Sequence, residues 1–441
     1  MNNDKKQKAI PKTRLGRLGR VARLAGGVAT GMLSEGAKQL SQGNRPKVSD
    51  MLLTPSNAKR VTKQLSAMRG AAMKVGQLLS MEANDLLPDE LAKILGELRN
   101  QAFSMPRTQL DSALVEAYGE DWLSLFQNFD YAPLAAASIG QVHRATTLDG
   151  ADIVLKIQYP GVAKSIDSDV DNIAMLLKVS NVLPKHMDIT DLLKDAKRQL
   201  HEEADYFQEA EYLEKFYAAL ANEPAFIVPK HYAQLTKKTI LAMQYVPGDA
   251  IENVDLLDAA GRDELMAKLF DLMLTELFDL RLMQTDANFA NYHYQANTNK
   301  VALLDFGATR AFPKKFVTDY KRLIRAVIAE DDEALIDAAE RLGYHTSKAS
   351  KRYQQFLLDV FHIGLEPFAH KGNYDFANAN ISSRITKLSD QAYDFKEFWQ
   401  TPPTDILYLH RKLGGMFLLA TRLGARVNCH AKVLPWIKTL A

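Results

Sequence analysis

Three polar motifs, each beside a short apolar run, follow one another along the middle of this 441-residue chain. The first is Lys156 in the run IVLKI, the second is the pair Asp286 and Asn291 in QTDANFANY, and the third is Asp305 in LLDFGATR. A lysine can bind phosphates, and carboxylate and carboxamide oxygens are ligands that suit Mg²⁺. In this order and spacing, the motifs predict a site for a nucleotide and its magnesium ion.

The segment around Lys156 reads as a series of strands. Residues 134–147 predict a strand, a tight loop and a second strand, and Asp149-Gly150 is a hairpin signal. Residues 151–159, which include Lys156, predict the next strand. Strands joined in this way, with a lysine on the last, are typical of the N-lobe of a protein kinase, in which that lysine binds the α- and β-phosphates.

The loop before the lysine departs from the kinase pattern. The kinase phosphate loop G-x-G-x-x-G-x-V falls on Ala135, Ala137, Gly140 and Val142, so only its third glycine is present. Because a Cβ limits how closely a backbone approaches a phosphate, we expect this alanine-rich loop to cover the phosphates differently.

A kinase lysine needs an acidic partner from a following helix. The spacing predicts a helix from about residue 191 to 220, and the stretch HEEADYFQEAE on it is rich in acidic residues. Spacing alone does not choose the partner among Glu202, Glu203, Asp205 and Glu209.

The catalytic loop and the segment after it also differ from those of protein kinases. Gln284-Thr285 replaces the His-Arg of the kinase loop, and no A-P-E follows D-F-G. The chain instead turns at Pro313 into a predicted helix over residues 314–329. Without a long segment after D-F-G, little surface remains on which a peptide could dock. The sequence therefore predicts a kinase fold that does not select protein substrates.

Helices are predicted before the strands. An i, i+3, i+4 apolar spacing predicts one helix from Thr54 to about Leu87, a second to about residue 100, and a third after Pro106. The first helix carries MKVGQLLS, which includes Lys74. Taken alone, Lys74 is interpreted as a solvated lysine on an amphipathic helix.

Charge is distributed unevenly along the chain. Residues 1–50 carry 11 basic and three acidic side chains, whereas the other 391 residues carry 44 basic and 50 acidic ones. The net charge of +2 gives no global field that favours nucleic acid. In the basic arm four arginines recur every three residues, interleaved with apolar residues, a pattern that fits a helix on an anionic membrane surface: Arg14, Arg17, Arg20 and Arg23. A solubilising disordered tail, or a helix docked on its own protein, are the alternatives.

Other classes of protein are excluded by composition. A single cysteine, Cys429, allows neither an intrachain disulfide nor a cysteine-based zinc site. No apolar run approaches the roughly 18 residues that would span a bilayer, and no apolar segment follows the basic start as in a secretory signal. We expect a cytoplasmic protein that reaches lipid, if at all, peripherally on the inner membrane.

Taken together, these features resemble the UbiB family of atypical kinase-like proteins, which is linked to ubiquinone biosynthesis in bacteria and mitochondria. The matching motifs lie between about Arg14 and Ala311. MKVGQLLS resembles the family's K-x-G-Q motif, LAAASIGQVH its alanine-rich loop and EADY its E-x-D motif, while QTDANFAN and VALLDFGATR are similar to its catalytic and metal motifs. Several bacterial members end in membrane-spanning helices, whereas the segment over residues 416–441 is expected to be too short and too charged to span a membrane.

The resemblance implies a fold and a division of the chain. The expected fold is α+β, a bilobal protein-kinase-like fold with an N-terminal helical extension packed over the active site. The expected parts are a basic, membrane-associating arm (1–50), a helical extension with the K-x-G-Q motif (51–130), an N-lobe (131–245) and a mostly helical C-lobe (246–441).

The resemblance also implies roles that spacing could not assign. Lys74 would lie over the nucleotide pocket, paired with Glu203 and Asp205, and Gln77 would help close the site to peptides. Glu209 would be the partner of Lys156. The remaining site residues would be the catalytic base Asp286, the magnesium ligands Asn291 and Asp305, the loop residues Ala135, Ala136, Ala137 and Ser138, and the adenine-reading segment from Met243 to Val246.

The expected function is that of a Mg²⁺-dependent, ATP-binding kinase-like ATPase that supports ubiquinone biosynthesis without phosphorylating peptides. Its expected partners are ATP, anionic membrane lipid, quinone-precursor lipids and ubiquinone-biosynthetic enzymes, with no nucleic acid. One alternative is a non-catalytic nucleotide-binding scaffold, against which the complete set of Lys156, Asp286, Asn291 and Asp305 argues. The other is a Ser/Thr protein kinase, which the missing A-P-E and the altered phosphate loop disfavour.

Overall fold

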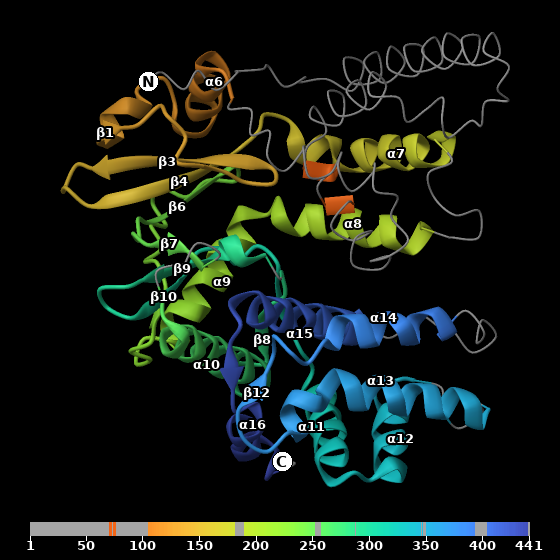
Figure 1. Cartoon of the computed structure of the whole chain (residues 1–441). Coiled ribbons are helices and arrows are strands. Elements are labelled where there is room, and N and C mark those ends of the chain that lie inside the picture. The colour runs from red at the N-terminus through yellow and green to blue at the C-terminus, as the bar shows by residue number, and fades with distance from the viewer. Residues whose placement is uncertain are drawn as a thin grey trace, which may run out of the picture. The chain divides into compact units, whose positions relative to one another are not determined.

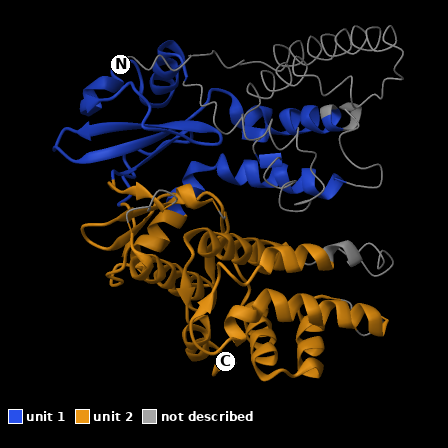
Figure 2. Cartoon of the chain, in the orientation of Figure 1, with its two compact units in different colours: residues 1–211, 230–245 blue, residues 212–229, 246–441 orange. Residues whose placement is uncertain are grey.

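A computed structural model of the chain describes residues 70–72, 74, 75, 105–180, 189–251, 257–286, 288–344, 346, 350–392 and 404–439 (Figure 1). The chain divides into two compact units (Figure 2). Unit 1 comprises residues 1–211 and 230–245, and unit 2 comprises residues 212–229 and 246–441. The basic arm, the predicted helices over residues 54–100 apart from 70–75, and Gln77 lie outside the described residues.

Unit 1 contains an antiparallel sheet with the order β1-β3-β4-β6, in which β2 also pairs with β3. Alternation along β4 places Ile153, Leu155 and Ile157 in one apolar cluster, which includes Leu110 and Leu114 of the helix before the sheet. Lys156 therefore points to the opposite face. The bounds are α6 (Arg107–Tyr118), β1 (Phe126–Phe129), β2 (Ala135–Ala136), β3 (Gly140–Thr147), β4 (Asp152–Gln158) and β6 (Ile240–Gln244).

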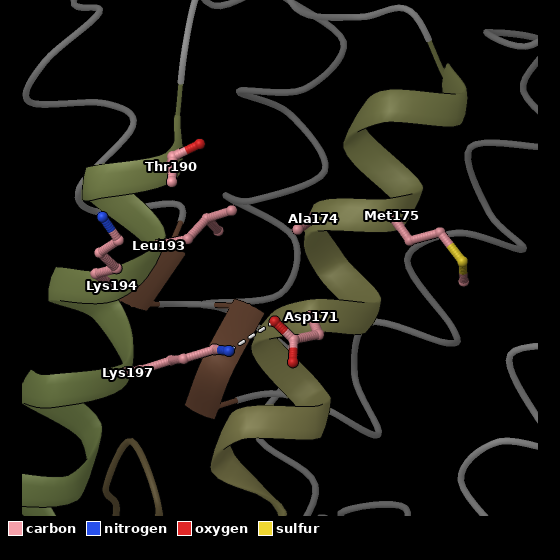
Figure 3. A pocket seen from close by; sticks show the side chains of 7 residues that line it. All are labelled: Asp171, Ala174, Met175, Thr190, Leu193, Lys194 and Lys197. Carbon is pink, nitrogen blue, oxygen red and sulfur yellow. Dashed lines mark ion pairs between the residues drawn. The ribbon is translucent and has the colours of Figure 1, made fainter.

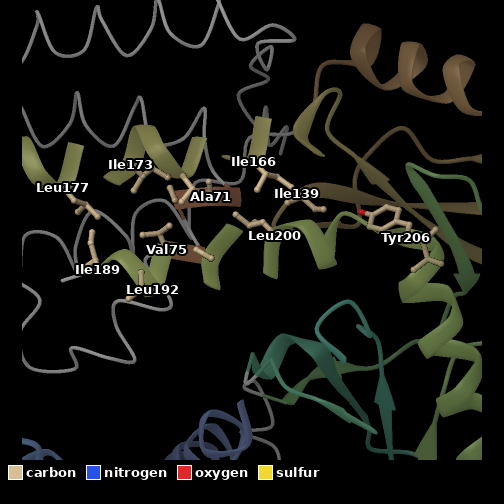
Figure 4. Close-up of a cluster of buried hydrophobic side chains, with 14 of the residues drawn as sticks. Ala71, Val75, Ile139, Ile166, Ile173, Leu177, Ile189, Leu192, Leu200 and Tyr206 are labelled. Carbon is tan, nitrogen blue, oxygen red and sulfur yellow. The ribbon is translucent and has the colours of Figure 1, made fainter. Parts of the chain in front are cut away.

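A pair of helices, α7 (Val162–Ser180) and α8 (Thr190–Glu203), forms the second core of unit 1 (Figure 4). The apolar residues of α7 recur at a helical spacing, from Ile166 through Val170 and Ile173 to Leu177, and face those of α8. The short helical segment at residues 70–75 packs into the same cluster through Ala71, Ala72 and Val75. Each buried branched side chain contributes about 1.5–3 kcal/mol to folding, so this segment is held to unit 1 by apolar packing.

The single helix predicted over residues 191–220 is wrong, because the chain forms two helices there. α8 ends at Glu203, and α9 (Tyr206–Ala219) begins after Asp205, whose carboxylate accepts a hydrogen bond from the backbone N–H of Gln208 at 3.1 Å. Asp205 therefore caps the second helix, and such a local side-chain bond competes with continuation of the first.

Unit 2 contains three small sheets among its described residues. One has the order β5-β10-β9-β7, another pairs β8 with β11, and the third pairs β12 (Tyr374–Asp375) with β13 (Arg426–Val427). The long helix α10 (Ala259–Thr275) passes into a π-helical turn (Glu276–Leu280), and Arg281 then turns the chain into β8 with a positive φ of 51°. The strands are β5 (Phe226–Ile227), β7 (Asp249–Ala250), β8 (Leu282–Gln284), β9 (Tyr292–Gln295), β10 (Lys300–Leu303) and β11 (Thr309–Ala311).

Helices make up most of the remainder of the described part of unit 2. The helix predicted after D-F-G is confirmed, since α11 begins directly after Pro313, and the helix predicted after Pro106 is confirmed by α6. The bounds are α11 (Lys314–Ala329), α12 (Asp332–Arg341), α13 (Lys351–Ala369), β12 (Tyr374–Asp375), α14 (Ile381–Ala392), α15 (Thr404–Leu423), β13 (Arg426–Val427) and α16 (Cys429–Ile437). Among the described residues, no helix has both the length and the apolar character needed to cross a membrane.

Candidate nucleotide site

Lys156 and Glu209 form a buried ion pair in unit 1. The Lys156 Nζ lies 2.7 Å from Glu209 Oε1 and 2.9 Å from Oε2, and the two side chains are only 9% and 1% exposed. The ammonium also lies 5.4 Å from the centre of the Tyr206 ring. Of the four acidic candidates, Glu202 and Asp205 are exposed and Glu203 is engaged elsewhere. The pairing of Lys156 with Glu209 is confirmed.

The alanine-rich loop forms a tight hairpin between β2 and β3. Ala135 pairs with Val142, and the Ala137 N–H donates to the Gly140 carbonyl at 3.0 Å. Ala135 and Ala136 are exposed, whereas Ala137 and Ser138 are half-buried. The hairpin belongs to the same sheet as Lys156, because β3 also pairs with β4.

Gly140, the one glycine kept from the kinase pattern, has a packing role. A Cβ at this position would lie 2.3 Å from the Ile157 carbonyl oxygen of the neighbouring strand. No side chain fits so close to a backbone oxygen, so the sheet itself requires glycine here.

Lys74 is buried, and its interpretation as a solvated lysine is wrong. Its side chain is 2% exposed, and its Nζ lies 2.5 Å from Glu203 Oε1. The other oxygen of the same carboxylate accepts a hydrogen bond from Ser138 Oγ at 2.7 Å. Glu203 therefore connects the residue 70–75 segment to the alanine-rich loop.

Gly70 lets this segment approach the loop closely. A Cβ on Gly70 would lie 2.9 Å from the Ser138 carbonyl oxygen and 3.0 Å from Ile139 Cγ2.

The expected pairing of Lys74 with Glu203 is confirmed. Asp205, the other implied partner, is exposed and caps α9.

Unit 2 brings the second and third motifs together. Asn291 directly precedes β9, and Asp305 follows β10, the strand that pairs with β9. The Leu304 N–H donates to the Asn291 carbonyl at 3.0 Å, so the two residues lie at the same end of this strand pair. Asn291 Nδ2 donates to Asp286 Oδ2 at 3.3 Å, and Asp305 Oδ1 accepts from the Gly307 N–H at 3.0 Å. The carboxamide and both carboxylates thus belong to neighbouring strand ends.

Asp286 has a cationic neighbour that the sequence did not predict. Arg411 of α15 lies with its Nη2 3.3 Å from Asp286 Oδ1, and the two side chains are 7% and 18% exposed. Such a pair favours the ionised carboxylate. The sequence signal is modest: the run HRK stands between the apolar stretches ILYL and LGGMFLLA of one helix.

The donor set suits magnesium in the way kinase sites do. Among the described residues no group of three or more His, Cys, Asp or Glu side chains could hold a metal ion by itself. Mg²⁺ is commonly bound by one or two protein oxygens together with phosphate oxygens and water. Asn291 and Asp305 fit that arrangement, in which nucleotide phosphates complete the shell.

The segment predicted to read the adenine begins in unit 1 and ends in unit 2. Met243 is buried on β6 opposite Val154, and Val246 is buried at the start of the following segment of unit 2.

A hollow of about 580 Å³ lies between α7 and α8, with the ion pair of Lys197 and Asp171 at 2.6 Å (Figure 3). Of the predicted site residues that the structure describes, none lines this hollow.

The sheet with its buried lysine–glutamate pair, and the Asp, Asn and D-F-G residues at neighbouring strand ends, define a protein-kinase-like protein. Residues 97–339 match the ABC1 atypical kinase-like domain. The chain therefore belongs to the ABC1, or UbiB, family of atypical kinases. The family and the kinase-like fold predicted from the sequence are confirmed.

Relatives match nearly the whole chain. Atypical kinase COQ8, mitochondrial, of Saccharomyces cerevisiae is 37% identical over 96% of this chain and 85% of its own length. Atypical kinase COQ8B, mitochondrial, of Rattus norvegicus is 36% identical over 97% of this chain and 81% of its own. The solved complex of Rv3197 with erythromycin from Mycobacterium tuberculosis shares the fold, with a TM-score of 0.60, 24% identity, and coverage of 87% of this chain and 96% of that one.

Proposed function

We propose that this atypical kinase-like protein is a Mg²⁺-dependent ATPase that supports the biosynthesis of ubiquinone or a related isoprenoid lipid and does not phosphorylate peptides. The observation that carries the proposal is the buried pair of Lys156 and Glu209, 2.7 Å apart. Burying two charges costs free energy that an apolar pair would not, and a kinase-type site uses such a pair to hold the lysine that binds phosphate. Relatives named as COQ8 atypical kinases support the biosynthetic assignment.

The proposed roles follow the chemistry of phosphoryl transfer. Lys156 binds the α- and β-phosphates and is held by Glu209, while Asp286 orients the attacking hydroxyl or water. Asn291 and Asp305 hold Mg²⁺, which neutralises charge on the phosphates when it is bound. Ala135, Ala136, Ala137 and Ser138 cover the phosphates, and the segment from Met243 to Val246 reads the adenine.

Lys74, Glu203 and Asp205, together with Gln77, are proposed to restrict the site to small substrates. The link from Lys74 through Glu203 to Ser138 supports this role, because it fixes the alanine-rich loop from outside the sheet. The four-part division of the chain, with an arm, an extension and two lobes, belongs to the same proposal.

The proposal is tested by following the γ-phosphate of labelled ATP. The expected result is released phosphate that rises with anionic liposomes and a phenolic quinone-precursor analogue, without a labelled protein. Transfer of the label to a peptide or to the chain itself would favour a Ser/Thr kinase. Nucleotide binding without release would favour the non-catalytic scaffold.

Replacing Ala137 by glycine is expected to change the affinity for ATP relative to ADP by about threefold or more, because the loss of one Cβ lets the hairpin backbone approach phosphate. Isothermal titration with each nucleotide measures this ratio. Ala132→Gly, in the segment before β2, is the matched control and should leave it unchanged. An unaltered ratio for Ala137→Gly would mean that the hairpin lies away from the phosphates.

Deleting residues 1–45 is expected to preserve nucleotide binding and to weaken sedimentation with anionic vesicles by about tenfold at low salt. The arm lies outside the described residues, and its eleven basic residues within 1–50 are the basis of this prediction. High salt should mimic the deletion by screening. If the truncated and full-length chains sediment equally at low salt, the arm is not the membrane contact.

A further inference from the structure

Another buried cation, Lys412 of α15, contacts the residues that flank the loop carrying Asp286 and Asn291. Its side chain is 2% exposed, and its Nζ donates to the Gln284 carbonyl oxygen at 2.8 Å and to the Tyr292 hydroxyl at 2.5 Å. Gln284 is two residues before Asp286, and Tyr292 directly follows Asn291. One ammonium group therefore binds both ends of the loop.

Glu276 is the acidic residue of the buried cluster formed with Lys412, Gln284 and Tyr292. Its side chain is fully buried, its Oε2 lies 3.7 Å from Lys412 Nζ, and its Oε1 accepts from the Gln284 N–H at 3.4 Å. Both backbone groups of Gln284 are thus bound by one ion pair. Glu276 begins the π-helical turn that leads into β8, and π-helical turns are frequent at functional sites.

The charge on Lys412 is maintained by its neighbours. Burial lowers the pKa of Lys412, but the Glu276 carboxylate and Tyr292 outweigh burial and raise this pKa overall. The lysine therefore stays an ammonium at neutral pH and keeps donating to its oxygen acceptors.

The same helix also contacts the segment after D-F-G. Arg310 Nε lies 2.8 Å from Asp405 Oδ1, and the Arg310 guanidinium lies 4.7 Å from the centre of the Tyr408 ring. With Arg411 on Asp286, α15 binds the catalytic loop and the residues after the metal motif. This chain has no A-P-E segment after D-F-G, and helix α15 contacts both the catalytic loop and the residues that follow the metal motif.

We propose that Lys412 is a positioning residue of the site: its ammonium, paired with Glu276, fixes both ends of the Thr285–Asn291 loop and thereby sets the positions of Asp286 and Asn291. Lys412 is covered by its own protein and acts only through the loop. The effect on turnover rests on the proposed ATPase function, whereas the effect on the loop does not.

The first test measures turnover in Lys412→Met, Lys412→Arg and the milder variant Tyr292→Phe. Because misplacement of a reacting group by about 1 Å can cost 10²-fold, we expect kcat for ATP to fall by about 10- to 100-fold in Lys412→Met with KM changed less than about threefold. Lys412→Arg should recover part of kcat, and Tyr292→Phe should lose less. The matched control is Lys432→Met, which removes the surface pair with Asp271.

The second test measures amide hydrogen exchange in the same variants without nucleotide. Peptides covering residues 282–292 should exchange at least about tenfold faster in Lys412→Met, while peptides from β3 and β4 should be unchanged. Where Lys412→Met does not fold, Tyr292→Phe carries both measurements. Unaltered exchange over residues 282–292, or an equal rise throughout unit 2, would overturn the proposal. Faster local exchange in Lys412→Met, together with no ATP hydrolysis by the wild-type chain, would overturn the proposed function and leave the positioning role in place.

Discussion

Replacing Lys156 by methionine is expected to lower ATP hydrolysis by at least about 10²-fold, because the site loses the cation that we propose binds the phosphates. The same change removes the Lys156 ammonium from the Glu209 carboxylate, which is only 1% exposed. Removing one member of a buried pair costs about 3–5 kcal/mol. The free energy of unfolding, measured with urea, should fall by that amount.

The double variant Lys156→Met with Glu209→Leu separates the two effects. Replacing both members of a buried pair by apolar residues is often neutral or stabilising, so the free energy of unfolding should recover while hydrolysis stays lost. If hydrolysis returned with stability, Lys156 would have only a structural role. If Lys156→Met kept near wild-type hydrolysis, the assignment of the phosphate-binding lysine would be wrong.

Changing Asp305 to asparagine is expected to abolish the Mg²⁺-dependent part of the thermal stabilisation by ATP. Asp305 is the charged member of the pair that fits the metal, and a carboxamide is a weaker ligand for a hard cation. Thermal shift with ATP, with and without Mg²⁺, measures the effect. Asn291→Ala should lose less, since it removes a neutral ligand.

A matched control for Asp305→Asn is Asp337→Asn on α12. Asp337 forms an exposed ion pair with Arg341, 2.7 Å apart, and exposed pairs contribute about 0–1 kcal/mol. This control should keep the full Mg²⁺-dependent shift. An undiminished shift in Asp305→Asn would remove this residue from the metal site.

The local elements and the order of the motifs could be predicted from the sequence. The helix after Pro313 and the strand bearing Lys156 follow from short-range patterns, namely a proline at a helix start and a short apolar run after the Asp149-Gly150 hairpin signal. Each depends on residues within a few positions of one another, and this is the range over which such patterns carry information.

The partners of the buried lysines could not be derived from spacing. Lys74 binds Glu203 from 129 positions away, and Lys412 binds Gln284 from 128 positions away. The break between α8 and α9 also depends on one capping bond of Asp205, which the helical spacing of the apolar residues conceals. These pairings depend on contacts between residues far apart in the sequence, and the residue pattern of a single segment carries no information about such contacts.

The central claim, that this chain turns over ATP with Asp286 acting on the nucleophile, is tested most directly by comparing the wild-type chain with Asp286→Asn. Binding and hydrolysis of MgATP are measured in the same samples. We predict that the variant binds MgATP within about threefold of wild type, while phosphate release falls by about 10²-fold or more, within the range for general-base catalysis. Equal phosphate release by the two proteins, or no release by the wild-type chain with lipid and quinone-precursor analogue present, would contradict the account.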